Sequence, residues 1–211
     1  MHRFLIAIVV LFNTLLTSSA HAADAPAAPV VPITPPLKIA IEGDKVLING
    51  TAFAMPCQRA DLEAVLGKPD RESDLTNFIL TWDQLGLVAY VIKEPGPKGK
   101  DGKATSIPTP KVRQVTVALD KEDLKYWPAK LFPGVVTVDG APVTAKTDVT
   151  ELNAAKKGEP FKAHSAIPAW HIINHENALI VIENASEKVG SKDAKISRVT
   201  IDARLAKPAK K

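Results

Sequence analysis

Apolar and polar residues alternate from residue 38 to residue 54, on both sides of Asn49-Gly50. A period of two is typical of half-buried strands, and Asn-Gly favours the type I′ turn of a tight hairpin. The pattern therefore predicts a β-hairpin. Asp139-Gly140 interrupts a similar pattern in "VVTVDGAPVT" and predicts a second hairpin.

A short helix is expected after each hairpin. Leu62, Val65 and Leu66 have the i, i+3, i+4 spacing of one helix face. In the second half, Asp148 and Glu151 are spaced as the N-cap and N3 residues of a capping box. Both helices are expected to end at a Gly-x-Pro sequence, because glycine suits the left-handed position after a helix and proline blocks its continuation.

Three strands are expected after each helix. The first set is "NFILTW", "LVAYVI" and "VRQVTVAL", with "DQLG" as a tight turn that places glycine where positive φ is needed. The second set is "AIPAWHI", "ALIVIEN" and "KISRVTID". Each half therefore predicts a hairpin, one helix and a three-stranded antiparallel meander, which is an α+β arrangement.

The two halves also align with one another. An offset of 90 residues places Gly50 on Gly140, and small shifts place Trp82 on Trp170 and Val115 on Val199. A fixed period of this kind indicates repeated units. We predict a tandem duplication, with a first repeat at residues 37–120, an apolar connector at 121–134 that packs in the seam, and a second, degenerate repeat at 135–205.

The N-terminal sequence predicts export. Arg3 precedes a short apolar run that ends before Ala20-His21-Ala22, and this order is typical of a signal peptide (residues 1–22) that is too short to remain as a membrane span. A Pro/Ala-rich spacer follows at 23–36, and residues 206–211 form a basic tail. We expect a periplasmic or secreted protein, cleaved near Ala22.

Composition excludes several classes. The formal net charge of +4 over 211 residues does not predict a nucleic-acid-binding face. Cys57 is the one cysteine, so the chain contains no internal disulfide or multi-cysteine zinc site. The sequence predicts no cofactor, and after the leader it predicts no transmembrane segment.

The first repeat resembles a known family. The residues that carry the resemblance are "MPCQRADLEAVLGKPDR", followed by an aromatic strand and "TWDQLGLVAY". They resemble a family of exported bacterial domains of unknown function, and more distantly they are similar to the SmpA/OmlA lipoproteins and to the β-lactamase-inhibitor-protein-like fold. The resemblance implies non-catalytic protein binding at an envelope. The chain differs from the lipoproteins because it lacks a lipid-anchor cysteine.

Several residues of the repeats have a structural and a functional interpretation. Arg71 is expected either to contact a partner or, as we favour, to pair with an acid such as Asp83 or to lie over Trp82. Trp82 and Trp170 are expected in the core. Cys57 precedes a helix, where a thiol can become reactive, but we favour a small residue that is buried or in a capping position.

His171, His175 and Glu176 are the alternative enzymatic site. Histidines four residues apart can share a metal on a helix, which would suit a metal-dependent hydrolase. The alignment instead places them on a strand and its turn, and we favour exposed histidines. No other catalytic motif stands out, so a non-enzyme is the leading expectation.

The most suggestive segment is the long Gly/Pro/Lys-rich loop expected at 94–111. Its lysines, together with those of the corresponding loop in the second repeat, are expected to share a surface that attracts an envelope protein or an anionic surface, unless both loops are merely solvated. These lysines are Lys98, Lys100, Lys103, Lys188, Lys192 and Lys195. The function expected is an exported, non-catalytic binding module. An inhibitor or immunity-type protein is a further alternative.

Overall fold

The computed structural model describes residues 36–99, 102, 104–185 and 194–203. The chain divides into two units at residue 30, and all of these residues belong to the second unit. The described elements are β1 (Lys38–Glu42), β2 (Lys45–Ile48), β3 (Thr51–Ala54), β4 (Cys57–Gln58), α1 (Arg59–Leu66), β5 (Arg71–Asp74), β6 (Phe78–Trp82), β7 (Leu87–Lys98), β8 (Ala104–Ala118), β9 (Val135–Val138), β10 (Ala141–Val143), α2 (Val149–Ala155), β11 (Lys162–Ala163), β12 (Trp170–Asn174), β13 (Ala178–Asn184) and β14 (Ile196–Ala203). The fold is α+β and rich in β-structure, as predicted.

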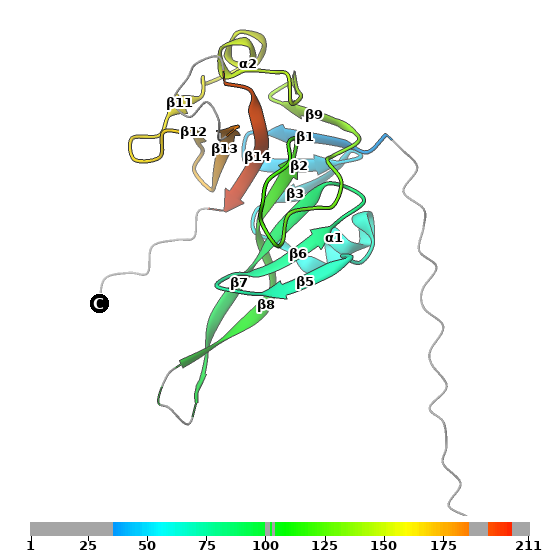
Figure 1. Ribbon diagram of the computed structural model, residues 1–211, viewed down its shortest axis with the longest axis vertical. Coiled ribbons are helices and arrows are strands. Elements are labelled where there is room, and N and C mark those ends of the chain that lie inside the picture. The colour runs from blue at the N-terminus through cyan, green and yellow to red at the C-terminus, as the bar shows by residue number, and fades with distance from the viewer. Residues whose placement is uncertain (1–35, 100–101, 103, 186–193, 204–211) are drawn as a thin grey trace, which may run out of the picture. The chain divides into compact units, whose positions relative to one another are not determined.

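The smaller sheet has the strand order β10-β9-β1-β2-β3, and Figure 1 shows β9, β1, β2 and β3 in this succession. Asn49 and Asp139 both have positive φ, 49° and 47°, and each precedes a glycine of positive φ. These are the two predicted type I′ turns. The first hairpin gains an unpredicted third strand, because Gly43 forms another turn between β1 and β2.

The larger sheet has the order β11-β12-β13-β14-β8-β7-β6-β5, with β4 paired to β8. β14 and β8 are antiparallel, with Thr200 opposite Thr116. Strands of both predicted repeats therefore share each sheet, and the repeats do not fold as two separate lobes. β4, β5 and β11 are additions to the predicted meanders, because short polar pairs such as Lys162-Ala163 carry too little alternation to detect.

One hydrophobic cluster joins both sheets and both helices. α1 buries Leu62 and Leu66, with Val65 packed beside them, and ends at Gly67, where φ is 78°. α2 has the predicted capping box between Asp148 and Glu151. It ends at Lys156 rather than at Gly158, since the backbone is already extended there.

The tryptophans lie in different environments. Trp82 is 2% exposed, and its indole N–H donates to the carbonyl oxygen of Gly67 at 2.9 Å, as expected of a core residue. Trp170 is only partly buried and donates to Glu183 Oε2 at 2.6 Å. The prediction of a core position for Trp170 is therefore wrong. Across from Trp170, the chain has Glu183, a charged partner, whereas Trp82 pairs with Leu87.

The connector is held against the sheet, as its apolar composition predicts. Trp127 packs in a small cluster with Ile79, Val88 and Ala118, and Phe132 belongs to the main core. The guanidinium of Arg198, from β14, lies 5.4 Å from the Trp127 ring centroid. The connector thus contacts strands of both halves.

Candidate binding surface

The segment expected as a long loop is mostly a two-stranded ribbon. Lys93 pairs with Pro108, Glu94 with Ile107, Pro95 with Ser106 and Lys98 with Ala104. We call the ribbon formed by residues 93–98 and 104–111 the arm. Figure 1 shows it continuing β7 and β8 beyond their neighbouring strands. The hairpin loop expected over 94–111 is therefore shorter than predicted, because Pro95, Gly96, Pro97, Pro108 and Pro110 lie within the paired strands of the ribbon.

Close packing holds the two strands of the arm together. A β-carbon on Gly96 would lie 2.5 Å from Thr105 Oγ1 and 2.8 Å from Ile107 Cγ1, so a larger residue at this position would require these side chains to move. The Thr105 hydroxyl donates to the carbonyl oxygen of Pro97 at 2.8 Å. Lys93 anchors the base through a 2.6 Å ion pair with Asp74. The arm is therefore an ordered element that presents a defined surface.

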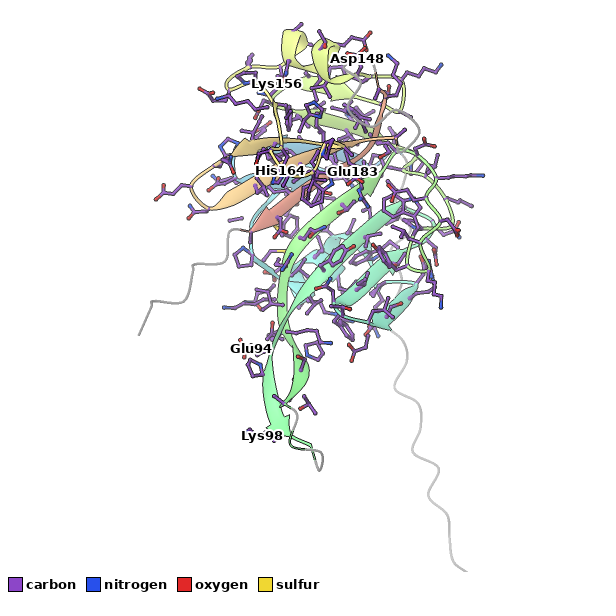
Figure 2. The ribbon with its side chains drawn as sticks, turned by 60° about the vertical axis from the view of Figure 1, so that its left-hand side comes forward. Glu94, Lys98, Asp148, Lys156, His164 and Glu183 are labelled. Carbon is purple, nitrogen blue, oxygen red and sulfur yellow. The ribbon has the colours of Figure 1, made fainter. Side chains whose placement is uncertain are left out.

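That surface combines apolar and charged groups. Ile107 is 50% exposed, which is high for a large aliphatic side chain. Beside it lies a hollow of about 350 Å³ that exposes mainly apolar atoms. The residues that line it are Glu94, Pro95, Ile107, Pro108, Thr109, Pro110 and Lys111. Figure 2 shows Glu94 and Lys98 at successive levels of the arm.

Of the six lysines that were expected to share a surface, the structure describes Lys98 and Lys195, and these two do not share one. Lys98 is exposed at the tip of the arm. Lys195 lies 3.2 Å from Asp148 Oδ2 and 3.6 Å from Glu151 Oε2, at the start of α2. Figure 2 places Asp148 and Lys98 at opposite ends of this unit. The cause is the antiparallel pairing of β8 with β14, which sets the start of β14 against the end of β8 that is remote from the arm. Lys100, Lys103, Lys188 and Lys192 lie outside the described residues.

Arg71 is engaged within the fold, as the sequence suggests. Its guanidinium holds both carboxylate oxygens of Asp83, at 2.7 and 2.8 Å, and donates to the carbonyl oxygens of Lys125 and Trp127. Asp83 also accepts the N–H of Ala129 at 2.8 Å. The Arg71 hydrogen bonds hold the pKa of Asp83 below its usual range. This pair fastens the connector to the β6–β7 turn and leaves little of the guanidinium for a partner.

The histidines of the alternative site lie on β12 and its turn, where the alignment placed them. Burial lowers the pKa of His171, whose Nδ1 is buried without a hydrogen-bond partner. His175 Nε2 is likewise buried and unpartnered. Over the described ranges, no three His, Cys, Asp or Glu side chains gather closely enough to hold a metal ion.

Cys57 is 8% exposed, and burial raises the pKa of its thiol to about 11. The favoured expectation of a small buried residue is confirmed. A protonated, enclosed thiol is a poor nucleophile.

Two features escaped sequence reasoning. One is a hollow of about 440 Å³ beside β12, lined by residues of the 159–165 segment and of 172–174. The other is the arginine cluster, in which Arg198 pairs with Glu183 and with Glu122 (3.2 Å). Burial raises the pKa of Glu122, and Arg198 opposes that rise. A charged residue within the apolar run "ALIVIEN" was the signal available for the cluster.

Within the residues that the structure describes, no helix is both long enough and apolar enough to cross a membrane.

The chain belongs to the DUF7738 family, a domain of unknown function, whose model matches residues 38–153. The matched range runs from β1 into α2, so it covers residues 38–120 of the first predicted repeat and the whole connector. Searches of curated proteins and of solved structures find no match. The resemblance to SmpA/OmlA lipoproteins and to the inhibitor fold stays a prediction.

Proposed function

We propose that this protein is an exported, non-catalytic binding protein of the bacterial envelope that contacts its partner through the arm. The observation that carries the proposal is the exposed ribbon of residues 93–98 and 104–111, where Ile107 adjoins an apolar hollow. A contiguous apolar surface that is rimmed by polar residues can mark an interaction site. The core of the fold does not require the arm, since its exposed residues add nothing to the main hydrophobic cluster.

The arm suits recognition by side chains rather than by strand addition. Pro95, Pro97, Pro108 and Pro110 lack the N–H groups that a new strand would need. Residues 93–111 contain five lysines against one glutamate and one aspartate. Positive charge around an apolar contact favours a partner with an acidic rim. Because the ribbon is already ordered, less conformational entropy is lost on binding than with an irregular loop.

Export is the second part of the proposal. It rests on the order of a charged residue, an apolar run and small residues within residues 1–22. With export, the arm would lie outside the cytoplasm. The mature N-terminus is expected near Ala23, which N-terminal sequencing of the protein from native cells measures directly.

The third part of the proposal is a tandem duplication, which the following correspondences support. Gln58 and Asp148, 90 residues apart, are the N-caps of α1 and α2, and Leu62 and Leu152 are 1% and 0% exposed at the same helical position. The Cys57–Gln58 pairing with β8 corresponds to the Asp148–Lys195 bridge. By strand pairing, Trp82 corresponds to Ile173, and not to Trp170 as the sequence alignment had it. β1 has no counterpart and lies between the two hairpins of the smaller sheet.

Charge reversal in the arm tests the binding role. Lys98, Lys100 and Lys103 are changed together to Glu, and the matched control changes the exposed lysines Lys121, Lys146 and Lys157. The variants are compared in cross-linking capture from the native envelope fraction. We expect the arm variant to lose capture by about tenfold or more, with an unchanged melting temperature, while the control retains it. Equal capture by both variants contradicts the proposal.

A further inference from the structure

One edge of the smaller sheet carries free backbone groups. The type I′ turn at Asn49-Gly50 makes Ile48 and Thr51 the closing, hydrogen-bonded pair of the β2–β3 hairpin. Bonded pairs alternate along an antiparallel ladder, so Val46 and Phe53 form the next one. The N–H and C=O groups of Ala52 and Ala54 therefore point away from β2. Both residues are exposed.

The opposite edge of the same sheet is closed at the corresponding place. The turn at Asp139-Gly140 makes Val138 and Ala141 the closing pair, so the next residue, Pro142, faces outward. Proline has no N–H to offer. The next outward-facing residue, Thr144, donates its N–H to Thr147 Oγ1 at 3.1 Å. At an offset of 90 residues, Pro142 corresponds to Ala52.

The edges of the larger sheet are also protected. β5 presents Arg71, Glu72 and Asp74, and charged side chains discourage strand pairing. β11 is two residues long and includes Lys162. A strand this short offers too few backbone hydrogen bonds to pair with another chain. Among the described strands, β3 is the edge with two outward-facing residues and with neither a charge nor a proline within its bounds.

We infer that β3 pairs antiparallel with β3 of a second copy of this chain. A two-fold axis through Phe53 sets Ala52 of each copy opposite Ala54 of the other, and both are in the hydrogen-bonding phase. Two outward residues per strand then supply four backbone hydrogen bonds. The side chains on the exposed face at this junction are methyl groups, which neither clash nor repel. The five-stranded sheets become one continuous sheet of ten strands.

The self-complementary spacing favours a second copy over an unrelated strand. In an isologous contact, both copies use the same residues. Ala52 and Ala54 are separated by one residue and are uncharged, so the two alanines of one copy can pair with the same two alanines of the other. The short ladder makes the association weak and concentration-dependent. It is independent of the arm and of the proposed binding function.

Sedimentation equilibrium and amide exchange of the purified protein test the inference. Ala52→Pro removes two of the four intermolecular bonds but no bond to β2, and it reproduces the residue that the chain has at 142. We expect the weight-average mass to rise from monomer toward dimer with concentration, and Ala52→Pro to weaken association by about tenfold or more. Ala52→Val keeps the N–H and is expected to associate as the unaltered chain does.

Amide exchange of the unaltered protein does not depend on the folding of a variant. The N–H groups of Ala52 and Ala54 are expected to exchange more slowly as the protein concentration rises, while that of Phe53, bonded to β2, stays constant. A protein that is monomeric to about 1 mM, with concentration-independent exchange at Ala52, overturns the inference. So does association that Ala52→Pro, folded by circular dichroism, leaves unchanged.

Discussion

The hydroxyl oxygens of Thr116 and Thr200 lie 2.9 Å apart, at the point where β8 of the first half pairs with β14 of the second. The two residues are direct partners in the ladder and also occupy equivalent places in "VTV" and "VTI". They are 2% and 8% exposed. The centre of the larger sheet is therefore a contact between matching positions of the two sequence segments that align with one another.

This contact predicts strong coupling between the two threonines. Thr116→Val leaves the Thr200 hydroxyl buried without its partner, and is expected to cost about 1–3 kcal/mol. Thr116→Val/Thr200→Val removes both hydroxyls and should cost less than the two single changes added together. Denaturant unfolding of the three variants measures the coupling, and strict additivity contradicts it.

Arg71 and Asp83 predict an acid-sensitive attachment of the connector. The pKa of Asp83 is lowered in the folded protein, so its ion pair stabilises the fold above the usual carboxyl pKa of about 3.9. That contribution is lost as the pH falls through the lowered value. Asp83→Asn is expected to cost about 1–2 kcal/mol near pH 7, less than a fully buried pair because Arg71 is partly exposed. Unfolding free energies between pH 7 and pH 2 should show a smaller fall for Asp83→Asn than for the unaltered protein.

Gly86 predicts a strict requirement for glycine in the β6–β7 turn. Its φ is 64°, and a β-carbon there would lie 2.2 Å from the backbone nitrogen of Phe132 in the connector. Gly86→Ala is expected to cost about 2–4 kcal/mol. Gly43→Ala is the matched control, since Gly43 has a similar φ of 59° and open space around it. Equal losses at the two positions, measured by thermal unfolding, would show that the connector does not press on the turn.

Cys57 predicts slow thiol chemistry in the folded state. A thiol pKa raised from 9.0 to about 11 leaves about a hundredfold less thiolate at pH 8, before burial slows access further. Alkylation followed by mass spectrometry should label Cys57 slowly in the native protein and rapidly in denaturant. Rapid native labelling contradicts the buried position.

Local signals predicted the elements well, because each was decided within a few residues. The turns at Asn49-Gly50 and Asp139-Gly140, the face of Leu62 and Leu66, and the capping box of Asp148 and Glu151 depend on neighbours alone. The pairing of Arg71 with Asp83 was also expected, although the β5–β6 hairpin that brings the two residues together was not predicted.

The failures concern positions decided by distant pairing. Trp170 looks like Trp82 in sequence, but the partner across the ladder is Glu183 rather than an apolar residue. Lys98 and Lys195 are far apart because β14 pairs antiparallel with β8. No local sequence pattern predicts this strand direction. Prolines in the arm suggested a loop, but neither β6 nor β14 extends along the arm, and proline is tolerated in strands that lie at a sheet edge.

A photo-activatable cross-linking residue at position 107 tests the central claim most directly. The same residue at position 121, which is exposed on the connector, serves as the control. The claim predicts that irradiation of cells or native envelopes yields a discrete cross-linked partner from position 107, that position 121 does not yield it, and that the Lys98/Lys100/Lys103 reversal suppresses it. Identical cross-linking patterns from both positions, or a product insensitive to the reversal, would contradict the arm as the binding element.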